Sequence, residues 1–492
     1  MSHIVNNLLF YIRKLVVISL AWIAGFTSPY IVASELPALG QDAATIISPY
    51  EERRIGEEAM VQIRQSLDFV SDAELSYYLQ QIGARLAASL PNSPHDFQFF
   101  LIAHPEINAF ALPGGFVGVH TGLITASRSE SELAAVLAHE ISHVTQRHWP
   151  RMVAAEKDRA GMTLAAVLAS IIIAGSGNPN GAGVAMAAMA ANADSQLAYT
   201  RSFEREADRI GIRLLSDGGY DVSAMAGFFE RLAEGSRYAG VEVPEFMRTH
   251  PVTNDRIAEA RNNEKRFTRH PSRQSEAFLH LVARIKALYQ PDTANSITGF
   301  RSELSSETGS KLSKQAARYG LALALMSNGD FGQAKKEISI LTGERPDFLQ
   351  YQVAAADIEL GSGRTDDGLR LYRYIYKSHA RNTWVLQRYA EVLIANQRAA
   401  TALNVLKLAL QQHPQDPILN KLMATASGDT GDLIQAHRSM AEYYVLNGDR
   451  HAAINQLNIA ERNAGKNYYV QAAIKARRLE IESGLGPTTQ TK

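Results

Sequence analysis

Hydrophobic residues recur at helical spacing over most of the chain, with one short region of strand character. Residues 51–67 and 72–90 place apolar side chains three and four positions apart, which predicts two helices. Apolar runs of strand length then follow at 97–104, 107–112 and 116–120, with a Pro-Gly-Gly turn before the last. The pattern predicts a mainly α-helical protein with a small β-sheet.

The segment 133-LAAVLAHEISHVTQRHWP-150 is predicted to be a helix that carries ionisable groups among apolar positions. In the order His139-Glu140-x-x-His143, the two imidazoles emerge on one face about one turn apart. Glu140 is rotated by roughly 100° from His139, so it can contact a water near the imidazoles rather than bind beside them. Buried ionisable groups need partners, and a metal ion is the partner that this spacing indicates.

A later predicted helix supplies the carboxylates that such a metal site requires. A catalytic zinc takes three protein ligands and keeps one open position, and a chain without cysteine must hold it through His and carboxylate. Glu204 and Asp208 lie four residues apart on one helical face. Glu204 is therefore the candidate third ligand beside His139 and His143. Asp208 is the candidate partner for the second ring nitrogen of one of them.

From about residue 315, small residues recur with a period of 34. Ala322, Ala356, Ala390 and Ala424 form one series, and two further series stay in register with it. A 34-residue period with small residues where paired helices cross is the tetratricopeptide signature. We predict an α-solenoid of four repeats, followed by trailing helices that cap the stack.

A short apolar run at positions 15–26 follows two basic residues near the N-terminus. A breaker-rich stretch with small residues at Ala33 and Ser34 comes next, which completes the layout of a secretory signal. The run is shorter than the roughly 20 residues that a membrane-spanning helix needs. We predict export, with a signal peptide over residues 1–34 cleaved near Ala33 or Ser34. An uncleaved anchor is the alternative.

Residues 161–193 contain no charged side chain, and the stretch 175-GSGNPNG-181 divides them into two halves. Neither half reaches membrane-spanning length. We interpret the segment as a packed or lid-like element. Transient contact with a membrane or client protein, and a true membrane insertion, remain the alternatives.

The charge balance excludes one class of partner. Lys plus Arg and Asp plus Glu both total 50, so the chain has no net field that would attract nucleic acid. Nucleic-acid binding is therefore not expected, whereas peripheral contact with a membrane stays open.

The combined motifs resemble a known class of protease. His139–His143 followed by Glu204–Asp208 looks like the gluzincin-type metallopeptidase clan that includes HtpX and the prenyl-protein CaaX proteases. With a signal before the motifs and repeats after them, the chain is similar to the periplasmic β-barrel assembly-enhancing protease family over nearly its whole length. The resemblance implies a gluzincin-type α+β zinc metallopeptidase domain over 45–270, a linking helix and loop over 271–314, and a repeat domain over 315–485.

By resemblance, one zinc ion per chain would be held by His139, His143 and Glu204, with Glu140 as general base in peptide hydrolysis. The implied clients are misassembled or stalled outer-membrane proteins, with the lipopolysaccharide-transport porin as one type. The implied partner is the β-barrel assembly machinery, reached in the periplasm. A chaperone or scaffold with a latent or structural zinc site is the alternative, and a non-peptide zinc hydrolase is a weaker one. Glu140 argues against a purely structural site, which needs no base.

The resemblance also assigns roles to two other segments. In 249-THPVTNDRI-257, the histidine that relatives can place in the open metal position is His250, and the alternative for it is an ordinary loop residue. Relatives receive an extended substrate along an edge strand. An ordinary buried strand is the alternative for the corresponding residues, which are Asn108, Ala109, Phe110 and Ala111. We interpret His104, His120 and His148 as structural or surface residues.

Overall fold

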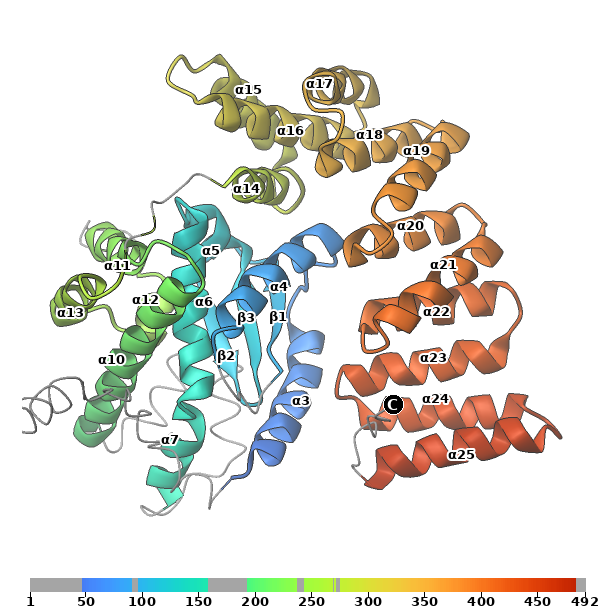
Figure 1. Ribbon diagram of the computed structural model, residues 1–492, viewed down its shortest axis with the longest axis horizontal. Helices are drawn as coiled ribbons and strands as arrows, with labels where there is room; N and C mark the ends of the chain where they lie inside the picture. The colour runs from blue at the N-terminus through green and yellow to red at the C-terminus, as the bar shows by residue number, and fades with distance from the viewer. Residues whose placement is uncertain are drawn as a thin grey trace, which may run out of the picture. The chain divides into compact units, whose positions relative to one another are not determined.

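The computed structural model describes residues 47–90, 96–157, 193–236, 243–268, 270 and 275–483. The predicted signal peptide and residues 161–192 lie outside the described residues. Helices dominate, and a three-stranded sheet lies among the first of them, so the expected fold class is confirmed (Figure 1). None of the helices in the described part of the chain has both the length and the apolar character needed to cross a membrane.

The sheet is formed by β1 (Gln98–Ile102), β2 (Ala109–Leu112) and β3 (Phe116–His120). Its strand order is β1-β3-β2, with β1 parallel and β2 antiparallel to the central strand β3. β1 and β2 are slightly shorter than their apolar runs, whereas β3 coincides with its run. Because β2 is an outer strand, one of its sides is not covered by another strand of this sheet.

The two faces of the sheet are buried by different helices because strand side chains alternate. On one face, Phe99 and Val117 join a core with α4 (Ala73–Ala87) and α6 (Glu130–Thr145). On the other face, Phe100 and Phe116 pack with α3 (Pro49–Ser66). The sheet therefore lies between two helical layers, and α6 lies against the face that includes Ala109 of β2.

Helix α6 packs along α10 (Ala193–Asp217), and this pair forms the frame of the site. Gly211 permits the close approach: a Cβ atom there would lie 3.3 Å from both the carbonyl carbon of Ala138 and the backbone nitrogen of His139. Around this pair lie α5 (Thr121–Ala126), α7 (His148–Lys157), α11 (Ser223–Gly235), α12 (Glu245–Thr249) and α13 (Asn254–Glu264).

The predicted continuous helix over 133–150 is wrong at its C-terminal end. Helix α6 ends at Thr145, and Arg147 adopts a φ of 53° before α7 begins at His148. The side chain of Arg147 is held in this break by Glu52 and by the main-chain carbonyl of Ile47. Long-range contacts of one side chain thus override the local helical pattern.

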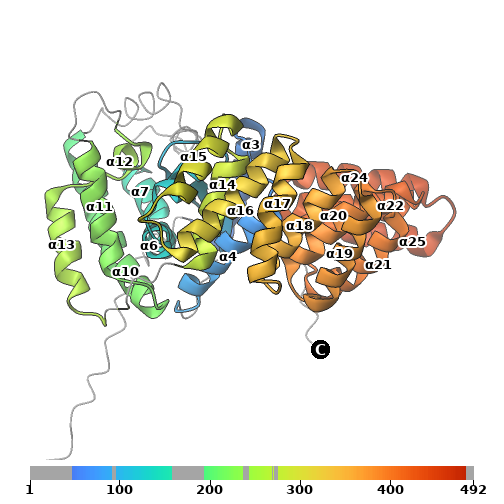
Figure 2. The same ribbon diagram turned by 90° about the horizontal axis from the view of Figure 1, so that it is seen from above.

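The second half of the chain is a succession of antiparallel helix pairs, stacked in chain order (Figures 1 and 2). The residues at the 34-residue period, Ala322, Ala356, Ala390 and Ala424, lie in the first helix of successive pairs and are all buried. The helices are α14 (Glu276–Leu288), α15 (Thr293–Ser305), α16 (Lys311–Ser327), α17 (Phe331–Glu344), α18 (Leu349–Gly361), α19 (Thr365–Ser378), α20 (Thr383–Ala395), α21 (Ala399–Gln412), α22 (Pro417–Asp429), α23 (Leu433–Leu446), α24 (Arg450–Asn463) and α25 (Tyr468–Ser483).

The helix pairs contact both α3 and α4. Arg284 of α14 forms ion pairs with Asp72, the N-cap of α4, at 2.8 Å, and with Glu74 at 3.1 Å. At the other end of the repeats, Nη1 of Arg64 in α3 donates to the carbonyl of Asn447 at 2.7 Å. Residues 43–492 accordingly form one compact unit.

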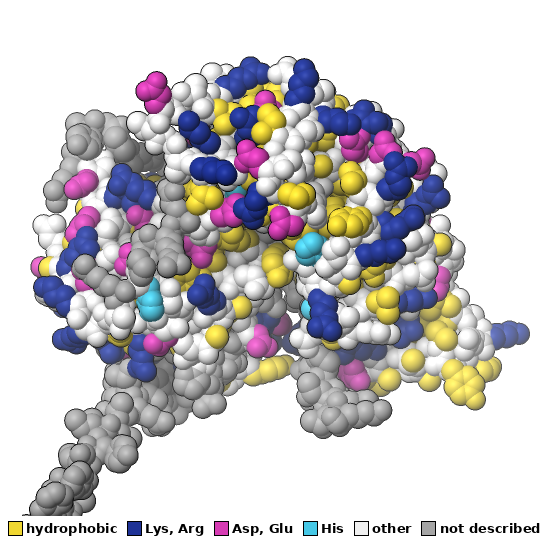
Figure 3. Space-filling model, turned by 45° about the horizontal axis from the view of Figure 1, so that its top comes forward, with side chains coloured by type: hydrophobic (Ala, Val, Ile, Leu, Met, Phe, Trp, Pro, Cys, Tyr) yellow, Lys and Arg dark blue, Asp and Glu magenta, His cyan; other side chains and the backbone are white. Residues whose placement is uncertain are grey.

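The outer surface carries charges of both signs. On the face shown in Figure 3, Lys and Arg side chains alternate with Asp and Glu side chains, and hydrophobic side chains lie among them. This mixture matches the balanced composition and gives that face no extended field of one sign.

Candidate metal centre

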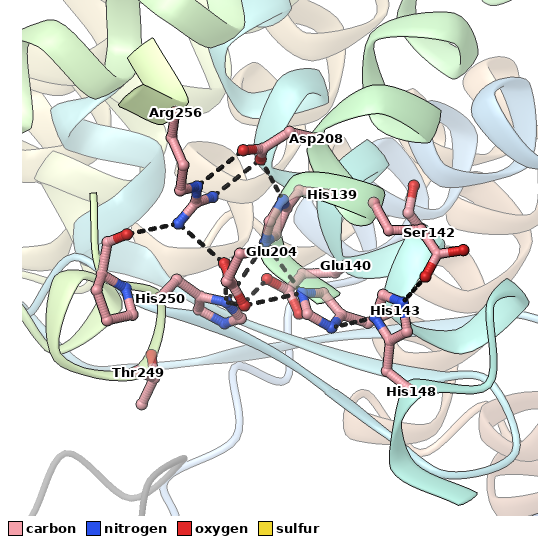
Figure 4. Close-up of polar contacts among 12 residues, drawn as sticks. His139, Glu140, Ser142, His143, His148, Glu204, Asp208, Thr249, His250 and Arg256 are labelled. Atoms are coloured by element: carbon pink, nitrogen blue, oxygen red, sulfur yellow. Dashed lines mark hydrogen bonds and ion pairs between the residues drawn. The ribbon is translucent and has the colours of Figure 1, made fainter. Parts of the chain in front are cut away.

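Three elements bring the predicted ionisable residues together (Figure 4). Helix α6 supplies His139, Glu140 and His143, α10 supplies Glu204, and His250 is the residue directly after α12. The helical spacing directs both α6 imidazoles toward α10, as the sequence indicated. All but His143 are buried below 10% exposure, so their polar atoms depend on one another rather than on solvent.

The ligating atoms of four residues converge on one point. In His139, His143, Glu204 and His250, one nitrogen or oxygen atom each lies within 4.8 Å of the others. Nε2 of His143 lies 3.0 Å from Nε2 of His139, and the Glu204 oxygens lie 3.3 Å and 3.4 Å from these nitrogens. Two imidazole nitrogens and a carboxylate gathered in this way form the donor set that zinc prefers.

His250, at the end of α12, also faces the point where the ligating atoms of His139, His143 and Glu204 converge. Its Nδ1 lies 3.0 Å from Oε1 of Glu204 and 3.3 Å from Nε2 of His139, while its Nε2 lies 3.5 Å from Oε1 of Glu140. The helix before it is fixed beside the sheet, because the Phe246 amide donates to the carbonyl of Ile107 at 3.1 Å. The structure thus brings His250 into the donor set rather than leaving it on a loop surface.

Asp208 contacts the second ring nitrogen of His139, at 2.9 Å between Oδ1 and Nδ1. Burial would lower the pKa of His139, but its hydrogen bonds to Asp208 and Glu204 raise it to about 10. A proton held on Nδ1 leaves Nε2 directed at the convergence point. The residue thus stands where the sequence spacing suggested.

Arg256 forms ion pairs with Glu204 and Asp208 of α10. The sequence pattern indicated no role for it. Its guanidinium contacts both oxygens of Asp208 at 2.8 and 2.9 Å, and Oε2 of Glu204 at 2.9 Å. Burial would raise the pKa of Glu204, but His250 and Arg256 hold it well below its usual range. Arg256 also donates to the carbonyl of Pro251 at 2.8 Å, which anchors the residue after His250.

Glu140 differs from the other carboxylates in its surroundings. Burial raises its pKa, although the neighbouring His250 and His139 lower it. Its Oε1 is buried without a hydrogen-bond partner, while the backbone amide of Ala111 lies close enough to the carboxylate to lower its pKa. Glu140 therefore lies between the donor set and strand β2.

The backbone geometry of β2 explains this contact. The His120 amide donates to the carbonyl of Asn108 at 3.0 Å, so in this antiparallel pairing Asn108, Phe110 and Leu112 exchange hydrogen bonds with β3. Ala109 and Ala111 alternate with them and direct their amide and carbonyl groups away from β3. The outer side of β2 thus faces the site.

His148 belongs to the site region, although its sequence position suggested a structural or surface role. Its Nδ1 lies 2.9 Å from Nδ1 of His143, and its Nε2 lies 3.2 Å from Oε2 of Glu206. The break in the helix at Arg147 makes this contact possible. His104, interpreted from the sequence as a structural or surface residue, contacts His120 with ring centroids 4.9 Å apart, and neither belongs to the donor set.

The donor set fits a metal ion on chemical grounds. The Nε2 atoms of His139 and His143 lie 3.0 Å apart, so once both are deprotonated their lone pairs face each other, and a shared cation removes the resulting repulsion. The carboxylate of Glu204 adds negative charge at the same point, and its lowered pKa keeps it ionised. The three residues therefore suit the ligand roles expected for them.

Comparison with known proteins agrees with this arrangement. Residues 74–264 match the family described as Peptidase family M48, and residues 359–426 match the family described as Tetratricopeptide repeat. A solved structure titled MamA RS-1 ArsTM double mutant covers 39% of this chain and 97% of its own at 12% identity, with a TM-score of 0.26, too low to bear on the fold. Fold and site define a metalloprotease of peptidase family M48 that carries tetratricopeptide repeats.

Relatives of similar length narrow the family further. The β-barrel assembly-enhancing protease of Yersinia pestis is 32% identical over 90% of each chain, and that of Escherichia coli (strain K12) is 32% identical over 90% of this chain and 91% of its own. The mitochondrial metalloendopeptidase OMA1 of Schizosaccharomyces pombe is 28% identical over 42% of this chain and 59% of its own. The chain belongs to the β-barrel assembly-enhancing protease family.

Proposed function

We propose that this metalloprotease is a zinc-dependent endopeptidase of the periplasm that cleaves misassembled or stalled outer-membrane proteins and promotes β-barrel assembly, including that of the lipopolysaccharide-transport porin. The observation that carries the proposal is the convergence of His139, His143 and Glu204 with Glu140 and the outer side of β2 beside them. The name of the relatives that match over 90% of this chain, β-barrel assembly-enhancing protease, supports the client class.

One zinc ion per chain would be held by His139, His143 and Glu204, with Asp208 orienting the first imidazole. When bound there, zinc supplies a Lewis acid that polarises a scissile carbonyl and lowers the pKa of water. Glu140 would take a proton from the attacking water through Oε1, which accepts no hydrogen bond here, and pass it to the leaving amine. The raised pKa of Glu140 makes it a better proton acceptor than an ordinary carboxylate, in keeping with the role of a base that also returns the proton.

The outer side of β2 would hold the substrate. An extended peptide adding to Ala109 and Ala111 forms main-chain hydrogen bonds that do not depend on its side chains, which suits clients of many sequences. The closeness of the Ala111 amide to Glu140 supports this role, because a peptide on β2 would then lie beside the proposed base. Asn108 and Phe110 would hold the strand through β3.

His250 would keep the enzyme latent between clients. Its contacts with Glu204 and Glu140 fill the space that a scissile peptide needs, and the Phe246–Ile107 hydrogen bond fixes the preceding helix next to β2. These contacts also favour a second function, a chaperone whose protease centre is largely silent. Activity of a variant without the imidazole separates the two functions.

The repeats would recruit clients and the β-barrel assembly machinery through their surface. We assign residues 1–34 to a cleaved signal peptide, 45–270 to the peptidase domain, 271–314 to a linking helix and loop, and 315–485 to the repeat domain. The match of residues 359–426 to the tetratricopeptide repeat supports the last assignment. We propose no nucleic-acid partner, which agrees with the balanced charge of the chain.

The metal assignment is tested by zinc content. His139→Ala, His143→Ala and Glu204→Ala should each bring bound zinc well below one ion per chain, measured by atomic emission on purified mature protein. His451→Ala, on the exposed surface of α24, is the matched control and should retain wild-type zinc. Stoichiometric zinc in the Glu204 variant would remove that residue from the ligand set.

A further inference from the structure

His143 has a second neighbour whose geometry parallels that of Asp208 beside His139. Its Nδ1, the nitrogen turned away from the donor set, lies 2.9 Å from Nδ1 of His148. The rings meet nearly perpendicularly, at 81°, with centroids 4.8 Å apart (Figure 4). Two nitrogens at this distance form a hydrogen bond only if one is protonated and the other is not.

The proton positions follow from the orientation of the rings. A neutral His143 that binds through Nε2 must carry its proton on Nδ1, so it donates to Nδ1 of His148. The proton of a neutral His148 must then be on Nε2, which lies 3.2 Å from the carboxylate of Glu206. Each of these two hydrogen bonds joins a donor to an acceptor. The series ends on the carboxylate of Glu206, which only accepts when it is ionised.

Three further contacts hold this chain of hydrogen bonds in place. Nη1 of Arg151 lies 2.8 Å from the same oxygen of Glu206, which keeps the carboxylate oriented. The ring of His148 stacks on Phe203 with centroids 4.5 Å apart and planes 16° apart. Arg151 lies over Phe203 at 4.6 Å. His148 is itself buried, so its hydrogen bonds are not exchanged freely with water.

We propose that His148 and Glu206 are positioning residues, which fix the proton of His143 on Nδ1 and thereby direct its Nε2 at the metal. The inference rests on the proposed zinc site. The two imidazole ligands would thus be oriented by separate carboxylates of α10, Asp208 acting directly on His139 and Glu206 acting on His143 through His148. Because α10 also carries Glu204, all three ligands would depend on the placement of this one helix.

The test is the zinc affinity of metal-free protein, measured by competition with a chromophoric chelator. His148→Phe retains the stacking on Phe203 but has no acceptor for His143. Loss of the partner of a metal-bound histidine typically weakens metal binding by about 10–100-fold, and this is the expected effect. His148→Asn places Oδ1 where Nδ1 stood and should recover most of the lost affinity, a rescue that a purely structural role does not predict.

A second variant keeps the test independent of core packing. Glu206→Ala removes the last group of the hydrogen-bonded series from a partly buried position and should weaken zinc binding several-fold, with folding checked by circular dichroism. Its matched control is Arg205→Ala, the exposed neighbour on the same helix, which should bind as wild type does. Wild-type affinity in folded His148→Phe or Glu206→Ala would overturn the inference. Failure of the wild-type protein to bind zinc would instead overturn the proposed function.

Discussion

The backbone amide of Ala111 lies beside the carboxylate of Glu140 and lowers its pKa. This contact links the outer strand of the sheet to the residue proposed as base. The strand proposed to pair with a substrate and the helix that carries the proposed base therefore meet at one main-chain group, so a peptide on β2 would lie within reach of Glu140.

Removal of that amide should impair cleavage without removing zinc. Ala111→Pro lacks the N–H group. Pro is tolerated on outer strands at positions whose N–H group does not pair with the neighbouring strand. A lost main-chain hydrogen bond is worth about 0.5–1.5 kcal/mol. We expect kcat/KM for a loosely folded substrate such as casein to fall by roughly 10-fold. Ala111→Gly, which keeps the amide, is the control, and an equal fall in both variants would argue against substrate pairing on β2.

Removal of the His250 imidazole should increase proteolysis. In His250→Ala the contacts with Glu204 and Glu140 disappear, while the three proposed zinc ligands remain. Cleavage of casein by purified protein is expected to rise several-fold, with zinc content unchanged. His451→Ala, exposed on α24, should leave the rate unaltered. A fall in the rate of His250→Ala would assign the imidazole to catalysis instead.

The buried cluster between α4 and α14 should make stability depend on pH. Burial raises the pKa of Glu74 to about 7, although Arg284 lowers it. Arg284 is already paired with Asp72, so a second ionised carboxylate leaves the cluster with excess negative charge. The folded state thus binds the Glu74 proton more tightly than the unfolded state. This stabilising contribution is present below pH 4.5 and is lost as the pH rises through about 7.

Replacement of Glu74 by Gln should remove this dependence. At pH 8 the free energy of unfolding of Glu74→Gln should exceed that of the wild type, by a difference on the order of 3 kcal/mol. Near pH 4 the two proteins should be nearly equal, as measured by urea denaturation at both pH values. Glu58→Gln, exposed on α3, is the control. A wild-type pH dependence in Glu74→Gln would show that another group is responsible.

The sequence predicted those parts of the site that depend on position within a helix. His139, His143, Glu204 and Asp208 follow from four-residue spacing, because a helix fixes which side chains share a face. The repeats were likewise predictable, because the 34-residue period reflects buried small residues such as Ala356 and Ala390.

The parts of the site that could not be predicted from the sequence depend on long-range contacts. His148 reaches His143 only because α6 breaks at Arg147, whose side chain is held by Glu52, 95 residues earlier in the chain. Arg256 lies 48 residues beyond Asp208, and no local pattern relates the two. Side chains that orient ligands from other elements leave no periodic signal, although an Arg close to a candidate histidine such as His250 is a reasonable residue to test.

The central claim is that zinc held by His139, His143 and Glu204 acts with Glu140 to hydrolyse peptides. The most direct test measures zinc content and casein cleavage side by side in purified mature wild-type protein and in Glu140→Gln, which keeps the shape of the side chain but cannot accept the proton. Both proteins should hold one zinc ion, and cleavage should fall in the variant by at least about 100-fold. Undiminished cleavage by zinc-loaded Glu140→Gln would contradict the account.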